Sequence, residues 1–224
     1  METTWWPGPG FDELLQRATA LLSAPSRTIL GIAGAPGAGK STLAAELLAA
    51  LSATSPGAVA LVGMDAFHLA QRVLDRHGLA ALKGAPETFD ALGYIAVLQR
   101  IKTATGTVYA PEFQREIEDS ISGNVEIGPE VRLVVTEGNY LLLPTPPWDQ
   151  VRPLLDEAWF VRVDDGTRRR RLSARHESFG HAPSAAHSKT HGSDEANAQL
   201  VNAAQNAVDV LIRVPDASAR GPAG

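Results

Sequence analysis

Apolar positions along the chain follow two patterns that alternate with each other. Short continuous apolar runs are typical of strands buried on both faces, and runs with apolar residues every three or four positions are typical of helices. The strand-like runs are 28–33, 58–64, the start of 131–143, 158–163 and 208–214. The helix-like runs are 11–22, 40–51, 167–180 and about 195–207. This alternation predicts an α/β fold with a mainly parallel central sheet between two helical layers.

Weaker signals lie between these runs. Asp90 is a candidate N-cap for a helix that carries Ile95, Leu98 and Ile101 on one side. The stretch "TVYAPEF" (107–113) reads as a strand broken by its proline, either an exposed edge hairpin or a flap over a substrate. A short helix is expected at 148–155, and the polar stretch after residue 180 reads as a connection. Residues 215–224 read as a disordered tail.

Composition narrows the class of protein. The 224 residues suit a single domain, 1–224, with a small helical lid at about 166–192. The net charge of −5 argues against a mainly nucleic-acid-binding role. The absence of cysteine excludes disulfides, thiolate zinc sites and thiol catalysis. No signal peptide and no membrane-spanning apolar run are recognisable. The expectation is a soluble cytoplasmic protein, monomer or homodimer, that does not act at a membrane.

The stretch "GAPGAGKST" carries the strongest chemical signal. Gly34, Gly39, Lys40 and Ser41 fit G-x-x-x-x-G-K-[ST] between a predicted strand and a predicted helix. Glycines let backbone N–H groups turn toward phosphates, and the helix adds its positive N-terminal end. Lys40 would reach the β- and γ-phosphates, and Ser41 would ligate Mg²⁺. The predicted nucleotide-binding residues are Gly34, Ala35, Pro36, Gly37, Ala38, Gly39, Lys40, Ser41 and Thr42.

Carboxylates follow two other predicted strands. Ligand sites of parallel sheets lie at the carboxyl ends of the strands, so these acids belong near the phosphate loop. Asp65 ends "LVGMD" and is interpreted as the general base that accepts a proton from a substrate hydroxyl, rather than as a turn or cap aspartate. Glu137 ends "LVVTE" and is interpreted as the acid that holds Mg²⁺, directly or through water.

The run "TRRRRLSARHESFG" (167–180) predicts a basic helix that ends at a glycine. Helical geometry places Arg168, Leu172, Arg175 and Phe179 on one narrow face, with Arg171 at its edge. Arginines beside a phosphate site neutralise the charge that develops on a transferred group. We expect Arg168, Arg171 and Arg175 to form a catalytic lid, and Arg169 and Arg170 to be largely on the surface.

Candidate acceptor-side residues come from three segments. Beyond Asp65 and Glu137, the predicted set is His68, Tyr109, Glu112, Arg115, Asn139 and Tyr140. His68 is close to Asp65 in sequence. "YAPEFQRE" supplies an aromatic, a carboxylate and Arg115 on the proline-broken strand. "GNYLL" after Glu137 would form the floor of a substrate pocket.

These motifs together resemble the phosphoribulokinase/uridine kinase family, and within it the uridine kinase-like and type I pantothenate kinase-like small-molecule kinases. The phosphate loop, "MDAFHL", "GAPETFD", "YAPEF", "VVTEGNYLLL" and "VDDGTRRRRLSARH" occur in the family's order over about residues 27–179. The resemblance implies a P-loop fold and transfer of the γ-phosphate of ATP, with Mg²⁺, to a hydroxyl of a small metabolite. Asp65, Glu137 and the three lid arginines fall on the family's base, magnesium and lid positions.

The acceptor is left open at this stage. A nucleoside or a pantothenate-like compound is expected ahead of a fructose-like sugar. Leu172 replaces a second adjacent arginine of uridine kinases, and the hairpin differs from theirs. A nucleotide monophosphate kinase would need more phosphate-binding residues for its acceptor. A regulatory nucleotide switch would need a guanine-reading N-K-x-D string, which the sequence lacks.

Overall fold

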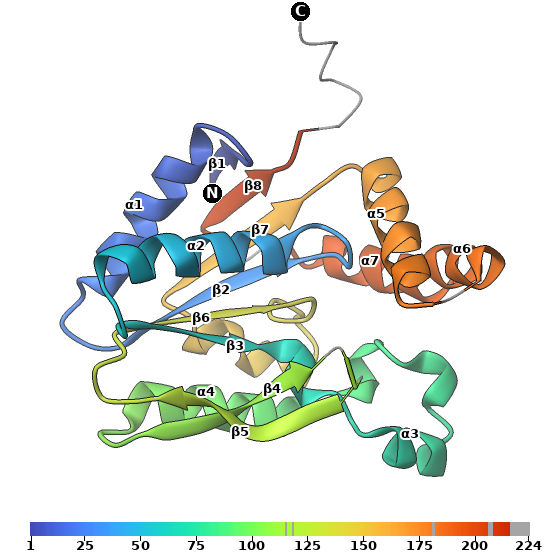
Figure 1. Ribbon diagram of the computed structural model, residues 1–224, viewed down its shortest axis with the longest axis horizontal. Helices are drawn as coiled ribbons and strands as arrows, with labels where there is room; N and C mark the ends of the chain where they lie inside the picture. The colour runs from blue at the N-terminus through green and yellow to red at the C-terminus, as the bar shows by residue number, and fades with distance from the viewer. Residues whose placement is uncertain (115, 118, 181, 206–207, 216–224) are drawn as a thin grey trace, which may run out of the picture.

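The central sheet has six strands that all run parallel. The computed structural model describes residues 1–114, 116–117, 119–180, 182–205 and 208–215. Its strand order is β1-β8-β7-β2-β6-β3, with parallel pairing at each step (Figure 1). The strands are β1 (Glu2–Trp5), β2 (Thr28–Gly34), β3 (Val59–Gly63), β6 (Leu133–Gly138), β7 (Glu157–Arg162) and β8 (Val210–Arg213). The predicted parallel sheet is confirmed.

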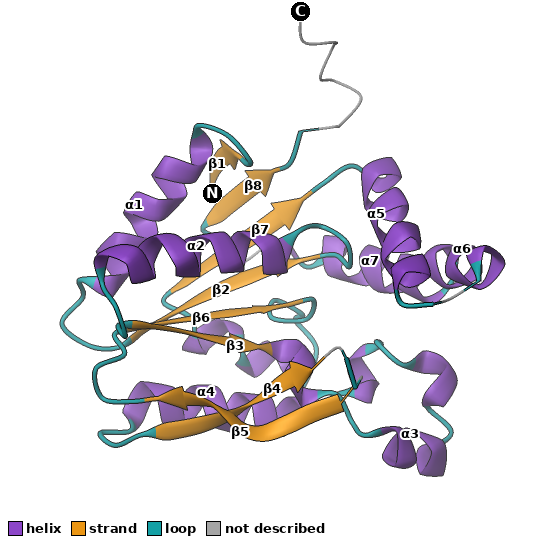
Figure 2. Cartoon of the chain, viewed as in Figure 1, coloured by secondary structure: helices purple, strands orange, loops and turns teal. Residues whose placement is uncertain are grey.

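Helices cover both faces of this sheet, as the apolar runs predict. β2 is buried at every position. Its Leu30 and Ile32 face a core shared with α1 (Gly10–Leu22) and α2 (Lys40–Thr54). Its Ile29 and Ala33 face the other core, which includes residues of α4 (Ala91–Thr103) and α7 (Ser193–Ala203). Figure 2 shows the resulting three layers, so the α/β/α architecture is confirmed.

Short helical segments and one hairpin connect these layers. β4 (Val108–Gln114) and β5 (Asp119–Ile127) form an antiparallel pair whose register shifts between Ala110 and Glu112, around Pro111. Asp90 caps α4 by accepting a hydrogen bond from the N–H of Gly93 at 2.8 Å, as predicted. The other segments are α3 (Gln71–His77) and 3₁₀ turns at Met64–Phe67, Ala80–Leu82, Pro86–Thr88, Trp148–Gln150 and Arg152–Leu154.

The C-terminal part of the chain contains α5 (Asp165–Ser178), α6 (Pro183–His191) and α7, and the predicted lid, about 166–192, covers most of α5 and all of α6. The prediction of a helix at 167–180 and of another near 195–207 is confirmed within a few residues. The polar stretch read as a connection instead forms α6, because Ala186 and Thr190 are buried while the remaining positions of α6 stay exposed. The predicted tail, 215–224, lies outside the described residues apart from Pro215.

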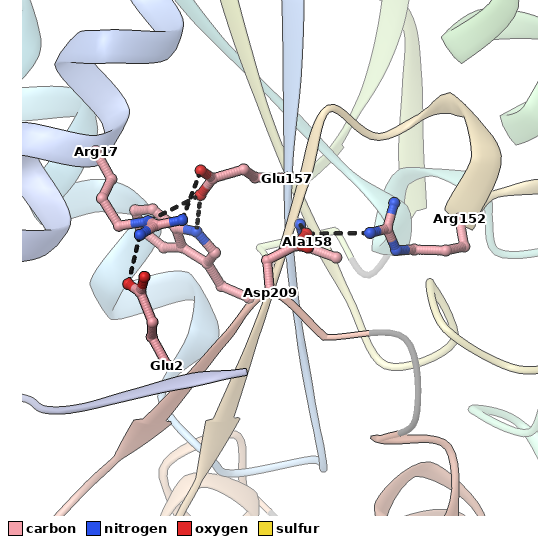
Figure 3. Close-up of polar contacts among 7 residues, drawn as sticks. Glu2, Arg17, Arg152, Glu157, Ala158 and Asp209 are labelled. Carbon is pink, nitrogen blue, oxygen red and sulfur yellow. Dashed lines mark hydrogen bonds and ion pairs between the residues drawn. The ribbon is translucent and has the colours of Figure 1, made fainter.

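The N-terminal strand β1 is the largest departure from the sequence pattern. Four residues, "ETTW", carry no apolar run, yet they pair with β8 from Glu2 opposite Val210 to Trp5 opposite Arg213. Figure 3 shows how side chains secure this edge of the sheet: Arg17 of α1 bonds both Glu2 of β1 and Glu157 of β7. Within the described residues, no helix is long and apolar enough to cross a membrane.

Candidate active site

The phosphate loop occupies the turn between β2 and α2. Gly34, Gly37 and Gly39 have φ values of 153°, 79° and 103°, in the region that favours glycine. Ser41 and Thr42 are exposed in the first turn of α2. A methyl group added at Gly37 would lie 2.8 Å from the Leu172 side chain and 3.0 Å from the Arg168 carbonyl. α5 therefore packs directly on the loop, and only glycine fits at this contact.

Lys40 is held in place by two neighbouring segments. Its side chain is buried, with 7% of its surface exposed. The ammonium donates to the side-chain oxygen of Asn139 at 2.8 Å and to the Ala35 carbonyl at 3.2 Å. Asn139 lies just after β6, next to β2 in the sheet. The structure thus brings Lys40 and Asn139, two predicted site residues, into direct contact.

Ser41 and Glu137 form a second contact between the loop and β6. The Ser41 hydroxyl donates to Glu137 Oε1 at 2.8 Å. Both are oxygen donors, the type that Mg²⁺ prefers, and Mg²⁺ is commonly held by one or two carboxylates together with substrate phosphates. The described residues contain no cluster of three or more acidic, histidine or cysteine ligands. The pair therefore fits a magnesium ion that a nucleotide brings with it.

Asp65 lies at the same edge of the sheet, in the 3₁₀ turn after β3. Gly63, the last residue of β3, is paired with Glu137 of β6. Asp65 comes two residues after Gly63, so it lies at the same end of the sheet as Glu137. Its carboxylate-bearing side chain is half-buried. Its backbone carbonyl accepts hydrogen bonds from the His68 backbone N–H at 3.2 Å and the His68 ring at 2.9 Å. This turn fixes Asp65 and His68 as one local unit.

His68 connects that unit to the β4–β5 hairpin. Its ring centroid lies 3.9 Å from that of Phe89 and 5.7 Å from that of Phe113 on β4. Tyr109 and Glu112 on β4 are exposed, and Glu112 accepts a hydrogen bond from Asn124 across the hairpin. The hairpin therefore approaches Asp65 through Phe113, which sequence reasoning did not single out. Arg115 lies outside the described residues.

Tyr140 is part of the core beneath the site. Its ring is fully buried against Phe89 and Trp148, and its hydroxyl donates to the Gly84 carbonyl. The pKa of Tyr140 is raised mainly by burial. The negative charges of Glu87, Asp65 and Asp194 raise it further. Tyr140 therefore acts in this structure as a support for the loop at Gly84.

The lid arginines differ from each other in their surroundings. Arg168 is buried, and its guanidinium bonds Asp165 and Glu195. In the described part of the chain, nothing hydrogen-bonds its third nitrogen, Nη1. Arg171 is exposed and lies 3.5 Å from the Ala38 carbonyl of the phosphate loop. Arg168 and Arg171 thus both lie next to the loop, as predicted.

The predicted inward face of α5 needs correction. Arg175 and Phe179 are exposed, whereas the buried positions are Thr167, Arg168, Leu172 and His176. The inward face turns toward His176, whose ring bonds Asp194 of α7 at 2.7 Å. Arg169, expected to be largely a surface residue, makes a two-point ion pair with Glu195. Arg170 is exposed, as expected.

Helix α7 supplies site residues that sequence reasoning missed. Asp194 and Glu195 bond α5, and Asn197 donates to the Gly84 carbonyl at 3.2 Å. Hydrogen bonds from Arg169, followed by those from Arg168, lower the Glu195 pKa to about 2 despite the opposing effect of burial. The sequence did carry a signal for these contacts: Asp194 and Glu195 are adjacent acids at the start of a helix, and an arginine-rich helix precedes them.

Known proteins similar to this chain are named kinases. No family model matches the chain. A Schizosaccharomyces pombe protein named "Putative uridine kinase" is 37% identical over 172 residues, covering 74% of this chain and 73% of that protein. The pantothenate kinase of Enterococcus faecalis is 33% identical over 138 residues, and the match spans 61% of this chain but only 45% of that enzyme.

A solved structure extends the likeness to the whole fold. The crystal structure of a "putative fructose transport system kinase" from Silicibacter sp. TM1040 superposes with a TM-score of 0.82 at 36% identity. The superposition covers 91% of this chain and 99% of that one. The chain belongs to the uridine kinase-like and pantothenate kinase-like family of P-loop kinases, and it is an ATP-dependent phosphotransferase that acts on a hydroxyl of a small molecule.

Proposed function

We propose that Asp65 is the general base of this kinase and that the acceptor is a nucleoside or a pantothenate-like compound. The observation that carries the proposal is the joint placement of four side chains, Lys40, Ser41, Asp65 and Glu137, at one edge of the parallel sheet. The Ser41–Glu137 contact links the phosphate loop to β6. The end of β6 lies beside the end of β3, which leads into the turn that holds Asp65. The base and the phosphate loop therefore share one site.

The donor half is assigned to the loop and to β6. Backbone N–H groups of 34–39 and the ammonium of Lys40 bind the triphosphate of ATP. Ser41 and Glu137 would hold Mg²⁺, which when bound would neutralise charge on the β- and γ-phosphates. Arg168 and Arg171 stabilise the charge on the phosphoryl group during transfer. The buried nitrogen of Arg168 has donor capacity that no described residue uses. Arg175, exposed and one turn farther along α5, belongs to the lid only as a weaker contributor.

The acceptor half is assigned to Asp65 and its neighbours. Asp65 removes the proton from the acceptor hydroxyl as its oxygen bonds the γ-phosphorus. The bond from that phosphorus to the bridging β,γ-oxygen breaks, and ADP leaves with the electron pair. The rings of His68 and Phe113 lie 5.7 Å apart next to the turn that holds Asp65, and aromatic side chains there support an acceptor with a flat ring such as a nucleoside. Tyr109, Glu112 and Asn139 are retained as acceptor-side candidates.

The same arrangement of residues is compatible with two alternative functions. A fructose-like sugar would also supply a hydroxyl to Asp65, and the name of the superposed structure supports testing it. A regulatory NTPase without a metabolic acceptor would use only the donor half. A cytoplasmic location and a monomeric or homodimeric state remain predictions from the sequence.

The experiment is an ADP-release screen with ATP and Mg²⁺ against nucleosides, pantothenate, ribulose 5-phosphate and simple sugars. We expect one acceptor class to raise ADP release well above the acceptor-free rate. Asp65→Asn should lower kcat for that acceptor by about 10²–10⁴-fold with little change in ATP binding. Asp75→Asn, on exposed α3, is the matched control and should leave the rate unchanged. Near-normal turnover in the Asp65 variant would remove the base assignment, and acceptor-independent ADP release would favour the regulatory NTPase.

A further inference from the structure

Arg168 of α5 is held by two carboxylates that come from different helices. Its Nε donates to Asp165 at 3.1 Å, and its Nη2 donates to Glu195 of α7. Nε and Nη2 form one edge of the planar guanidinium group, so these two bonds fix its position and the direction of its plane. The third nitrogen, Nη1, is buried and has no hydrogen-bond partner among the described residues. The group is therefore anchored along one edge, and a donor is left over at the opposite corner.

The two carboxylates differ in how firmly the fold holds them. Asp165 begins α5 itself, and its side chain is 55% exposed. Glu195 lies in the first turn of α7, and its side chain is only 18% exposed. Glu195 also accepts two hydrogen bonds from Arg169, both of 3.0 Å. Glu195 is therefore the firmer of the two anchors, and it holds Arg168 from a separate helix that lies beside α5 (Figure 1).

α7 is attached to the body of the protein and not to α5 alone. Its Val201 lies in the core cluster that also contains Ile29 and Ala33 of β2. Its Asn197 is buried and donates to the Gly84 carbonyl at 3.2 Å. Glu195 comes two residues before Asn197 in the same helix. Because a helix is a rigid support, Glu195 has a fixed place relative to β2 and to the phosphate loop that follows β2.

Arg168 contacts that loop directly. A methyl group added at Gly37 would lie 3.0 Å from the Arg168 carbonyl and 3.4 Å from its Cγ. The first part of the arginine side chain therefore lies against the loop, and its far end is held by Glu195. Burying an ion pair contributes little net stability, because the loss of hydration offsets the attraction between the charges. What the arrangement does provide is a defined position for a cation beside the loop.

We propose that Glu195 is a positioning residue for Arg168, which it holds so that Nη1 is available to the phosphoryl group during transfer. The inference rests on the proposed role of Arg168 and adds a residue from a helix outside the phosphate-loop motif. Glu195 acts through Arg168 and does not touch the nucleotide. Its contribution therefore falls on the transition state, where charge on the transferred group must be stabilised, and not on the binding of ATP in its ground state.

The test compares two probes by calorimetry with Mg²⁺: ATP, and ADP with aluminium fluoride, which imitates the phosphoryl group in transfer. Neither probe requires that the acceptor is known. Glu195→Gln should weaken binding of the aluminium fluoride complex by about tenfold or more, and should change ATP affinity by less than about twofold. Arg168→Gln should show the same selective loss. The double variant should lose no more affinity than Arg168→Gln alone, because the two residues act as one unit.

Arg169→Gln is the matched control. It removes an ion pair from the same carboxylate but leaves the bond between Glu195 and Arg168, so it should lower Tm while both affinities stay near those of wild type. Glu195→Asp keeps the charge and moves the carboxylate back by one methylene group. It should lose affinity for the aluminium fluoride complex selectively, and it carries the test if Glu195→Gln does not fold. Thermal unfolding of each variant checks that the fold is retained.

The outcomes separate this inference from the proposed function. Unchanged affinities in Glu195→Gln or Glu195→Asp, or an equal loss for both probes, would overturn the positioning role and leave the kinase assignment intact. A loss in Arg169→Gln as large as that in Glu195→Gln would also overturn it, because a general loosening of α5 would explain both. If Arg168→Gln bound the complex like wild type, or if wild type bound neither probe, the proposed donor half would fail together with the inference.

Discussion

The ammonium of Lys40 and the side-chain oxygen of Asn139 lie 2.8 Å apart, across 99 positions of sequence. Lys40 begins α2, and Asn139 follows β6, so the contact joins the phosphate loop to the strand that carries Glu137. A buried cation needs a partner, and Asn139 provides a neutral one that leaves the positive charge of Lys40 available for phosphate. This contact turns the loop motif into part of a larger site.

Asn139→Ala should weaken ATP binding and lower kcat, by about tenfold in kcat/KM for ATP. The ammonium would lose its 2.8 Å bond to Asn139, and it would be placed less well for phosphate. Steady-state kinetics with varied ATP measure the change. Gln99→Ala, on the exposed side of α4, is the control. Wild-type kinetics in Asn139→Ala would show that Lys40 is positioned without this bond.

Glu137→Gln should raise the Mg²⁺ concentration needed for half-maximal rate, by about tenfold. The amide keeps the size of the side chain and can still bond Ser41, but it removes the negative charge that favours the cation. A magnesium titration at fixed ATP gives the result. Glu126→Gln, exposed on β5, should leave the titration unchanged. An unaltered magnesium dependence in the Glu137 variant would contradict its role at the metal.

Gly37→Ala should destabilise the protein and abolish ATP binding. The position has φ of 79°, and a methyl group there would collide with Leu172 and the Arg168 carbonyl. Gly57→Ala is a matched control, because φ is 76° and nothing lies within 4 Å of the added methyl group. The backbone strain alone costs about 1–3 kcal/mol, which Gly57→Ala should show in urea unfolding. Equal effects of the two variants would mean that the lid contact is unimportant.

Stability should depend on the charge of Glu195 at acidic pH. The Arg169 and Arg168 guanidinium groups hold its pKa at about 2, below its value in the unfolded chain of about 4.3. A lowered folded pKa adds stability that is fully present above about pH 4.3 and is lost as the pH falls toward 2.

Glu195→Gln should therefore lower Tm at pH 7, and the difference from wild type should shrink between about pH 4.3 and 2. Differential scanning calorimetry across this range measures it. Glu177→Gln, exposed on the same lid helix, provides the comparison. A difference in Tm that stays constant with pH would exclude the ion pair as its source.

Tyr140→Phe should lower the free energy of unfolding by about 1 kcal/mol, because it removes a hydrogen bond to the Gly84 carbonyl within a buried cluster. Asn197 would remain as a donor to that carbonyl. Tyr109→Phe, at a tyrosine that is 55% exposed, should change stability by much less. Urea unfolding of both variants decides the matter. Equal stability of wild type and Tyr140→Phe would mean that the bond contributes nothing net.

Sequence reasoning worked where the information is local. The phosphate loop needs glycines, a lysine and a hydroxyl at fixed short spacing, so the order of residues 34–42 predicts it, and the structure confirms the turn between a strand and a helix. Buried strands such as β2 stand out because both of their faces are apolar. The Asp90 cap depends on atoms three residues apart. The placement of Asp65 and Glu137 at one edge followed from the rule that parallel strands share their carboxyl ends.

The tertiary structure decided what depends on contacts between distant segments. The inward face of α5 includes His176 rather than Arg175, because His176 bonds Asp194 of α7, and α5 by itself does not encode that choice. β1 is too short and too polar to be recognised until β8 offers an open edge with matching backbone groups. The Glu195 pairs join residues from separate helices. Local spacing therefore determined the chemistry of the phosphate loop, whereas packing between distant elements determined the side chains that surround it.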